Sequence, residues 1–152
     1  MIKGADLKDQ KLLGDLGAKE RDRIAKVLAE EQHAKGAQVF TEDSPTRGIF
    51  LVKKGRVEIA KTTADGWKHT LAVLSEGNFF GELSTIEGRT THSTKATALD
   101  DIVLYRLATE DFKRLEHEEP QVLYKIMKTI ARMASRNVHT MNEKLIKALI
   151  SY

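Results

Sequence analysis

Residues 77–98 read GNFFGELSTIEGRTTHSTKATA, and this stretch decides the fold. It opens with a Gly-rich turn between apolar segments, which can arrange backbone N–H groups around a phosphate. Gly81 has no side chain, so its backbone can approach a ligand closely. Glu82 offers an acceptor for a sugar hydroxyl, and Ser84 adds a hydroxyl or an amide donor. A lone Gly-Glu pair is more often a simple turn with a solvated glutamate, so the rest of the chain has to decide between the two.

Length and composition describe one globular domain. The chain has 152 residues, of which 31% are charged and 41% hydrophobic. It contains no cysteine, which excludes disulfides and thiolate metal sites and suits the reducing cytoplasm, where we expect the protein. The first residues, MIKGADLKDQ, contain no apolar core of signal-peptide length, and no run of about 18 apolar residues occurs, so no membrane span is expected. A net charge of +3 is too small to predict nucleic-acid binding.

Three zones follow one another within this single domain, residues 1–152. Residues 1–35 are predicted to form N-terminal helices, because apolar residues recur at helical spacing and Gly36 suits a helix end. Residues 36–107 hold short β-rich runs between turns, with Asp65-Gly66 as the sharpest hairpin signal. The expected strands are residues 39–40, 49–52, 57–59, 71–74, 94–99 and 102–107. Such closely spaced short strands predict a sandwich or a barrel.

The last zone, residues 108–152, is predicted to be helical. Thr109 is a suitable N-cap, and Pro120 marks the start of a second helix of about 30 residues and about 45 Å. An apolar stripe with steps of three and four follows Leu123, Met127, Ile130, Ala134, Val138, Met141, Leu145 and Leu149. The stripe can pack on the domain's own strands, or a second copy can pair along it. The length of the helix favours the second reading, a homodimer.

Several segments in order resemble the cyclic-nucleotide-binding domain family. Residues 35–59, KGAQVFTEDSPTRGIFLVKKGRVEI, are similar to the first half of its barrel, and residues 93–107 resemble the strands after its phosphate-binding cassette. TEDFKRL, residues 109–115, resembles the helix that follows. The resemblance covers essentially the whole chain. It implies an α+β fold, in which an antiparallel β-barrel or jelly roll (a double-stranded β-helix) is flanked by N-terminal helices and a long C-terminal helix.

The resemblance also implies a set of ligand-binding residues. The family's Gly-Glu-Leu-Ala/Ser segment, which lines ribose and phosphate, falls on Gly81, Glu82, Leu83 and Ser84. The family's Arg-Ser pair falls on His92 and Ser93, so the arginine that pairs with the phosphate is replaced. Counting by the family's shorter loop puts Thr91 there instead. Arg89 lies two or three positions early and would need a loop shift to reach the phosphate.

Histidine is a weaker phosphate ligand than arginine. Arginine is always charged and clamps a phosphate with two parallel N–H bonds, whereas histidine, with a pKa of about 6.5, is mostly neutral at pH 7. Affinity for a cyclic phosphate is therefore expected to fall by one or two orders of magnitude, unless Arg89 or Lys95 compensates. Three outcomes fit: weak binding of a cyclic nucleotide, a different and less anionic ligand, or no ligand. His92 itself has a second reading, as a partly exposed loop histidine without a role.

The third part of such a site covers the base. In the family's dimeric regulators, the long helix after the barrel lies over the base and pairs two subunits. Aligned without gaps from Pro120, the base-contacting position falls on Asn137. Asn137 can hydrogen-bond a purine edge, or it can sit in the dimer seam, where one buried asparagine fixes the register.

The sequence therefore supports three functional hypotheses, all on one fold. The first is a stand-alone bacterial sensor domain that binds cAMP or cGMP weakly or with altered preference, without any certain cofactor. The second is a scaffold or interaction module with an empty pocket. The third is the effector half of a catabolite-activator-like transcription regulator. Because the chain stops at Tyr152, where the helix-turn-helix domain of that class begins, we expect no DNA binding by this chain. The histidines lack metal-ligand spacing and no catalytic motif occurs, so an enzyme is not expected.

Overall fold

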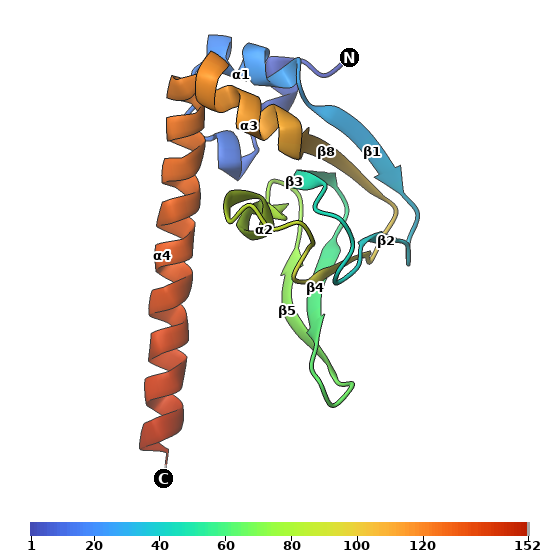
Figure 1. The fold of residues 1–152 in the computed structure, drawn as a ribbon, viewed down its shortest axis with the longest axis vertical. Coiled ribbons are helices and arrows are strands. Elements are labelled where there is room, and N and C mark those ends of the chain that lie inside the picture. The colour runs from blue at the N-terminus through green and yellow to red at the C-terminus, as the bar shows by residue number, and fades with distance from the viewer. Residues whose placement is uncertain (152) are drawn as a thin grey trace.

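Two four-stranded antiparallel sheets form the centre of the molecule (Figure 1). The computed structural model describes residues 1–151. One sheet has the strand order β1-β8-β3-β6 and the other β2-β7-β4-β5. The strands are β1 (Ala29–His33), β2 (Gln38–Phe40), β3 (Gly48–Lys54), β4 (Val57–Thr62), β5 (Lys68–Leu74), β6 (Phe79–Phe80), β7 (Lys95–Ala98) and β8 (Ile102–Ala108). Over these residues the sheets pack as a two-layer jelly roll and do not close into a barrel.

Strand β3 separates two hydrophobic cores. Ile49 and Leu51 pack in a core under the helices, whereas Phe50 and Val52 pack in a core between the two sheets. Because both faces of β3 are covered, its sequence is a continuous apolar run rather than an alternating one. The cluster between the sheets also holds Phe80, at the end of β6, and therefore lies directly beneath the predicted cassette.

The N-terminal zone differs from the sequence prediction. It holds two short 3-10 helices, η1 (Gly4–Leu7) and η2 (Lys11–Leu13), and then α1 (Ala18–Ala25). The expected helix over the rest of residues 1–35 is wrong, because β1 occupies Ala29–His33 and pairs with β8 from Ala29↔Arg106 to His33↔Ile102. The sequence AEEQH has no alternating apolar residues, so only its pairing partner makes it a strand.

Two helices follow the sheets, α3 (Thr109–Glu118) and α4 (Pro120–Ile150). Pro120 occupies the start of α4, as predicted. The N-cap of α3 is Ala108, so Thr109 is the first helical residue rather than the cap. Thr109 Oγ1 instead donates to the Thr46 carbonyl at 3.5 Å. None of the described helices combines the length and the apolar character that a membrane crossing requires.

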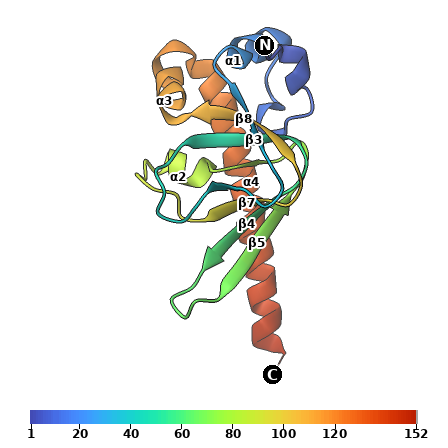
Figure 2. The same ribbon diagram turned by 90° about the vertical axis from the view of Figure 1, so that its right-hand side faces the viewer.

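The long helix α4 is held by the body of the protein only over its first part. Val122, Ile126 and Ile130 are buried, and Lys125 and Arg132 form ion pairs with α1 and the segment before it. The later stripe residues, Val138, Met141, Leu145 and Leu149, are 54–69% exposed. Figures 1 and 2 show this part of α4 running on past the sheets, in the same general direction as the β4–β5 hairpin. The apolar stripe thus packs on the domain's own core in its first half and is uncovered in its second.

Candidate functional site

The predicted cassette is a sharp strand-to-helix turn. Strand β6 ends at Phe80, Gly81 turns the chain, and the short helix α2 (Glu82–Ile86) begins. Gly81 has a φ of 83°, a left-handed conformation, and a β-carbon there would lie 2.6 Å from the Gly48 carbonyl oxygen of β3. Only glycine satisfies both conditions. Thr85 Oγ1 donates to the Gly81 carbonyl at 2.9 Å and closes the turn.

The residues of the Gly-Glu-Leu-Ser segment point in different directions from α2. Glu82 is half-buried, and burial raises the pKa of its carboxyl group above the ordinary value. Leu83 is 55% exposed, whereas Ser84 is buried. The Ser84 carbonyl accepts a hydrogen bond from the Arg89 backbone N–H at 3.0 Å, which folds the following loop back on α2.

His92 is a core residue. Its side chain is 2% exposed and stacks on the ring of Phe40, with centroids 3.6 Å apart and ring planes at 8°. His92 Nε2 accepts a hydrogen bond from the Arg47 backbone N–H at 3.1 Å. The His92 backbone also pairs with Ser44 and Asp43, at 2.9 and 3.1 Å. The reading of His92 as a partly exposed loop histidine is therefore wrong, because its ring extends the phenylalanine cluster of the inter-sheet core.

This environment keeps the His92 imidazole neutral. Burial, assisted by the charge of Arg47, lowers the pKa of His92 to about 4. At pH 7 the ring therefore carries no positive charge. Because Nε2 accepts a hydrogen bond from the Arg47 backbone, the ring proton of the neutral form is on Nδ1. In this arrangement His92 supplies no cation for an anionic ligand.

The other basic residues near the cassette are also directed elsewhere. Arg89 is exposed, and its Nη1 lies 3.5 Å from Glu87 Oε2. Lys95 alternates along β7 with Ala96 and Ala98, which are buried between the sheets, so the Lys95 side chain lies on the outer face. The compensation considered for Arg89 and Lys95 is not present in this arrangement.

A comparison with known protein families identifies the fold. The cyclic nucleotide-binding domain family is matched over residues 30–119, more than half of the chain. The chain belongs to this family. The matched region runs from β1 to the end of α3 and includes the whole of the cassette, so the predicted resemblance is confirmed.

Relatives of this cyclic nucleotide-binding domain are regulatory proteins. The chain is 31% identical over 109 residues to a cAMP-dependent protein kinase regulatory subunit of Debaryomyces hansenii. The aligned residues make up 72% of this chain and 23% of that relative. The chain is also 29% identical over 127 residues to the cyclic AMP receptor protein of Thermus thermophilus. This alignment covers 83% of this chain and 58% of that relative. The solved structure of Thermus thermophilus catabolite activator protein superimposes with a TM-score of 0.79 at 24% identity, over 91% of this chain and 63% of that one. The chain thus spans only part of each relative.

Asn137 continues the face of α4 that packs on the body of the protein. Ile126, Ile130 and Met133 pack on the core, and steps of four, three and four continue that face to Asn137. The exposed apolar stripe is centred on Val138 and its neighbours one turn apart, so Asn137 flanks the stripe on the body side. Asn137 is exposed in this structure, and both of its readings, a base contact and a residue of the dimer seam, stay predictions.

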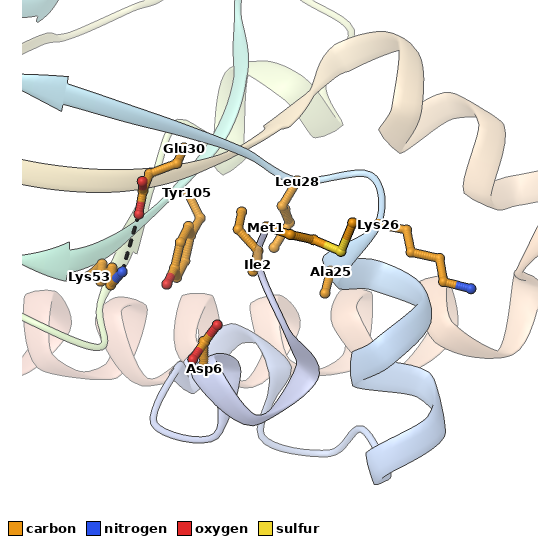
Figure 3. Close-up of a pocket in the computed structure, with 9 residues that line it drawn as sticks. All are labelled: Met1, Ile2, Asp6, Ala25, Lys26, Leu28, Glu30, Lys53 and Tyr105. Carbon is orange, nitrogen blue, oxygen red and sulfur yellow. Dashed lines mark hydrogen bonds and ion pairs between the residues drawn. The ribbon is translucent and has the colours of Figure 1, made fainter.

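A hollow in the surface lies away from the cassette (Figure 3). It measures about 540 Å³ and lies between the N-terminal segment and the sheet that contains β1, β3 and β8. Ile2, Leu28 and Tyr105 supply apolar surface, and the ion pair between Lys53 Nζ and Glu30 Oε1, 3.2 Å long, crosses one edge. Among residues 1–151, no group of three His, Asp or Glu side chains is placed to bind a metal.

Proposed function

We propose that this chain is a ligand-sensing regulatory domain whose affinity for cyclic nucleotides is weak because its phosphate site lacks a cation. The observation that supports the proposal is the buried, neutral side chain of His92, the residue that our alignment predicts at the position of the family's arginine. A charge-assisted hydrogen bond contributes roughly 1.5–3 kcal/mol, against about 1 kcal/mol for a neutral one. Because neutral His92 offers no charge-assisted bond, affinity for cAMP or cGMP falls by one to two orders of magnitude.

In this proposal α4 transmits the binding event. Ion pairs of 2.6 Å, Lys125–Glu20 and Arg132–Asp15, join the first half of α4 to α1 and to the turn before it. The second half has no such contacts in its exposed stripe, so a base held by Asn137 would fix its position relative to the sheets. The alternative is a scaffold or interaction module on the same fold, and the same His92 supports it, since a pocket without a cation need not hold any nucleotide.

The first prediction concerns cyclic nucleotide binding. Titration of ¹⁵N-labelled protein with cAMP and with cGMP at pH 7.5 should shift the amide signals of Gly81–Ser84, Ser93 and Asn137, with dissociation constants of roughly 100 µM or weaker. The signal of Gly66, an exposed glycine in the turn between β4 and β5, serves as the internal control. Dissociation constants below 1 µM would contradict the claim that the phosphate site lacks a cation. Unchanged spectra at 10 mM ligand would contradict nucleotide binding and favour the scaffold or interaction module.

The second prediction concerns self-association, which we propose to occur through the exposed half of α4. Its side chains Val138, Met141 and Leu145 form a seam with steps of three and four, the pattern of a two-stranded coiled coil. Leu145→Asp should convert a dimer to a monomer in sedimentation equilibrium at 10–100 µM protein, because it places a charge in that seam.

The matched control is Thr140→Asp, which introduces the same charge on the side of α4 away from the seam and should leave the dimer intact. A wild-type protein that is monomeric at 100 µM would contradict the proposed dimer, and the exposed stripe of α4 would then be a surface feature of a single chain.

A further inference from the structure

Two arginine side chains share one glutamate at the β1 edge of the sheet β1-β8-β3-β6. Glu31 Oε2 accepts hydrogen bonds from Arg47 Nη2 at 2.5 Å and from Arg106 Nε at 2.7 Å. The other oxygen, Glu31 Oε1, lies 3.1 Å from His33 Nε2. The side chain of Glu31 is 16% exposed and those of the two arginines are 36% and 27% exposed. The cluster is therefore half-buried, and the two guanidinium groups lie next to each other because they bond to the same oxygen atom.

This cluster holds one positive charge more than it neutralises. Glu31 supplies one negative charge for two guanidinium groups, and an arginine side chain keeps its proton at every ordinary pH. Within residues 1–151 neither arginine forms an ion pair with any other carboxylate. His33 adds no negative charge in either of its protonation states. Because charges taken out of water are normally paired, the excess charge points to an anion that the chain itself does not provide.

The two arginines also have hydrogen-bond donors to spare. Arg47 Nη1 donates to the Val39 carbonyl at 3.3 Å and Arg106 Nη1 donates to the Arg47 carbonyl at 3.2 Å, so both side chains are fixed in orientation. No hydrogen bond within residues 1–151 uses Arg47 Nε or Arg106 Nη2. Neither nitrogen is enclosed, since the enclosed side-chain atoms without a partner in this part of the chain belong to Gln10 and Arg21. Fixed N–H groups that solvent can reach, on two adjacent guanidinium groups, suit an oxyanion.

The cluster is separate from the cassette. In the order β1-β8-β3-β6, Glu31 and Arg106 lie on β1 and β8, towards one edge of the sheet, whereas the cassette follows β6 at the other edge. The backbone N–H of Arg47 bonds the His92 ring, but the guanidinium group of Arg47 turns away to Glu31. A ligand at the arginine pair therefore occupies a different place from a ligand at Gly81 and Glu82.

We propose that Arg47 and Arg106 form a second ligand site, which binds the carboxylate group of a small organic acid. A carboxylate carries one negative charge at neutral pH and so matches the single charge in excess. Its planar pair of oxygens also accepts parallel N–H bonds from a guanidinium group. The inference does not depend on the proposed function, because neither the cassette nor α4 takes part in it.

An NMR titration of the full chain with acetate at pH 7.5 tests this site. Sodium acetate replaces sodium chloride at constant ionic strength, and the side-chain ¹⁵Nε and ¹³Cζ signals of arginine are followed. The signals of Arg47 and Arg106 should shift and saturate with a dissociation constant on the order of 10 mM. Arg114, whose guanidinium group pairs with Asp111 on α3, is the internal control and should not shift. A linear shift up to 200 mM acetate, or an equal shift of Arg114, would overturn the inference.

Glu31→Gln is the sharper variant, because it removes the carboxylate that competes for the two arginines. Affinity for acetate should rise at least tenfold, since both guanidinium groups are then without a negative partner. Glu30→Gln is the matched control: Glu30 is the preceding residue of β1 and pairs with Lys53 instead, so its loss should leave acetate binding unchanged. Unchanged or weaker acetate binding by folded Glu31→Gln would mean that the cluster is only a structural ion-pair network.

Arg106→Gln decides the question if Glu31→Gln does not fold. This variant removes the excess charge but keeps the pair between Arg47 and Glu31. The saturable shift of the Arg47 signals on addition of acetate should therefore disappear, with the unfolding midpoint measured in parallel to show that the variant is folded. An Arg47 shift that persists in folded Arg106→Gln with the wild-type dissociation constant would overturn the inference.

Discussion

Replacing His92 with alanine is expected to lower the free energy of unfolding by about 3 kcal/mol, as truncation of a buried aromatic side chain does. The ring is 2% exposed and stacks on Phe40 at 3.6 Å, so its removal leaves a cavity in the inter-sheet core. It also leaves the Arg47 backbone N–H without its acceptor. Urea unfolding at pH 7.5, followed by far-UV circular dichroism, measures the change.

The matched control is His69→Ala, because His69 is exposed on β5 and its truncation should cost less than about 0.5 kcal/mol. A loss below 1 kcal/mol for His92→Ala would mean that the ring is not a core residue and is free to face a ligand.

The same burial makes stability depend on pH. The pKa of His92 is about 4 in the folded protein, below the value of about 6.5 expected in the unfolded chain, so protonation favours unfolding. The contribution of neutral His92 is complete above pH 6.5 and is lost as the pH falls towards 4. His92→Phe keeps an aromatic ring on Phe40 but cannot be protonated, so its stability should fall less than that of the wild type between pH 6.5 and 4.5.

Gly81→Ala is expected to lower the free energy of unfolding by about 3 kcal/mol and to disorder the cassette. A left-handed conformation costs a residue with a β-carbon roughly 1–2 kcal/mol, and overpacking adds about 1–3 kcal/mol. Here the new β-carbon would lie 2.6 Å from the Gly48 carbonyl oxygen, which belongs to the backbone of β3 and cannot move aside easily. Urea unfolding gives the energy, and amide spectra of residues 77–98 show the local effect.

Gly36→Ala separates the two causes. Gly36 has a φ of 87°, close to the 83° of Gly81, but a β-carbon added at Gly36 would meet no atom within 4 Å. The substitution should therefore cost only the conformational part, about 1 kcal/mol. Equal losses for the two variants would show that the contact between the cassette and β3 is looser than described.

Local residue patterns predicted most of the strands but not all of the elements. The β-branched and aromatic runs around Val39, Ile49, Val57 and Ile102 are found in strands, and Asp65-Gly66 does connect β4 to β5. Strand β1 was missed because its five residues carry no apolar alternation and only the edge of β8 makes them a strand. Helix α2 was missed because five residues are too few to show a helical period.

The sequence also predicts some features of the candidate site and not others. Glycine and glutamate at positions 81 and 82 match the family's motif, and the alignment predicts His92, or Thr91 with a shorter loop, at the arginine position. The direction of the His92 ring could not be predicted, because it depends on a stack with Phe40 and on the Arg47 backbone, which are distant in sequence. One sequence feature is consistent with the observed direction of the ring: Phe40, on which His92 stacks, is a third phenylalanine in the core that holds Phe50 and Phe80.

The central claim is that His92 is a neutral core residue and not a phosphate-binding cation, and NMR tests it most directly. A long-range ¹H–¹⁵N spectrum of the His92 ring, recorded from pH 5 to pH 8 with and without 5 mM cAMP, reports the protonation of both ring nitrogens. We predict a neutral ring with its proton on Nδ1 throughout that range, unchanged by the nucleotide, in keeping with a pKa of about 4. Titration of the ring near pH 6.5, or its protonation on addition of cAMP, would contradict the account.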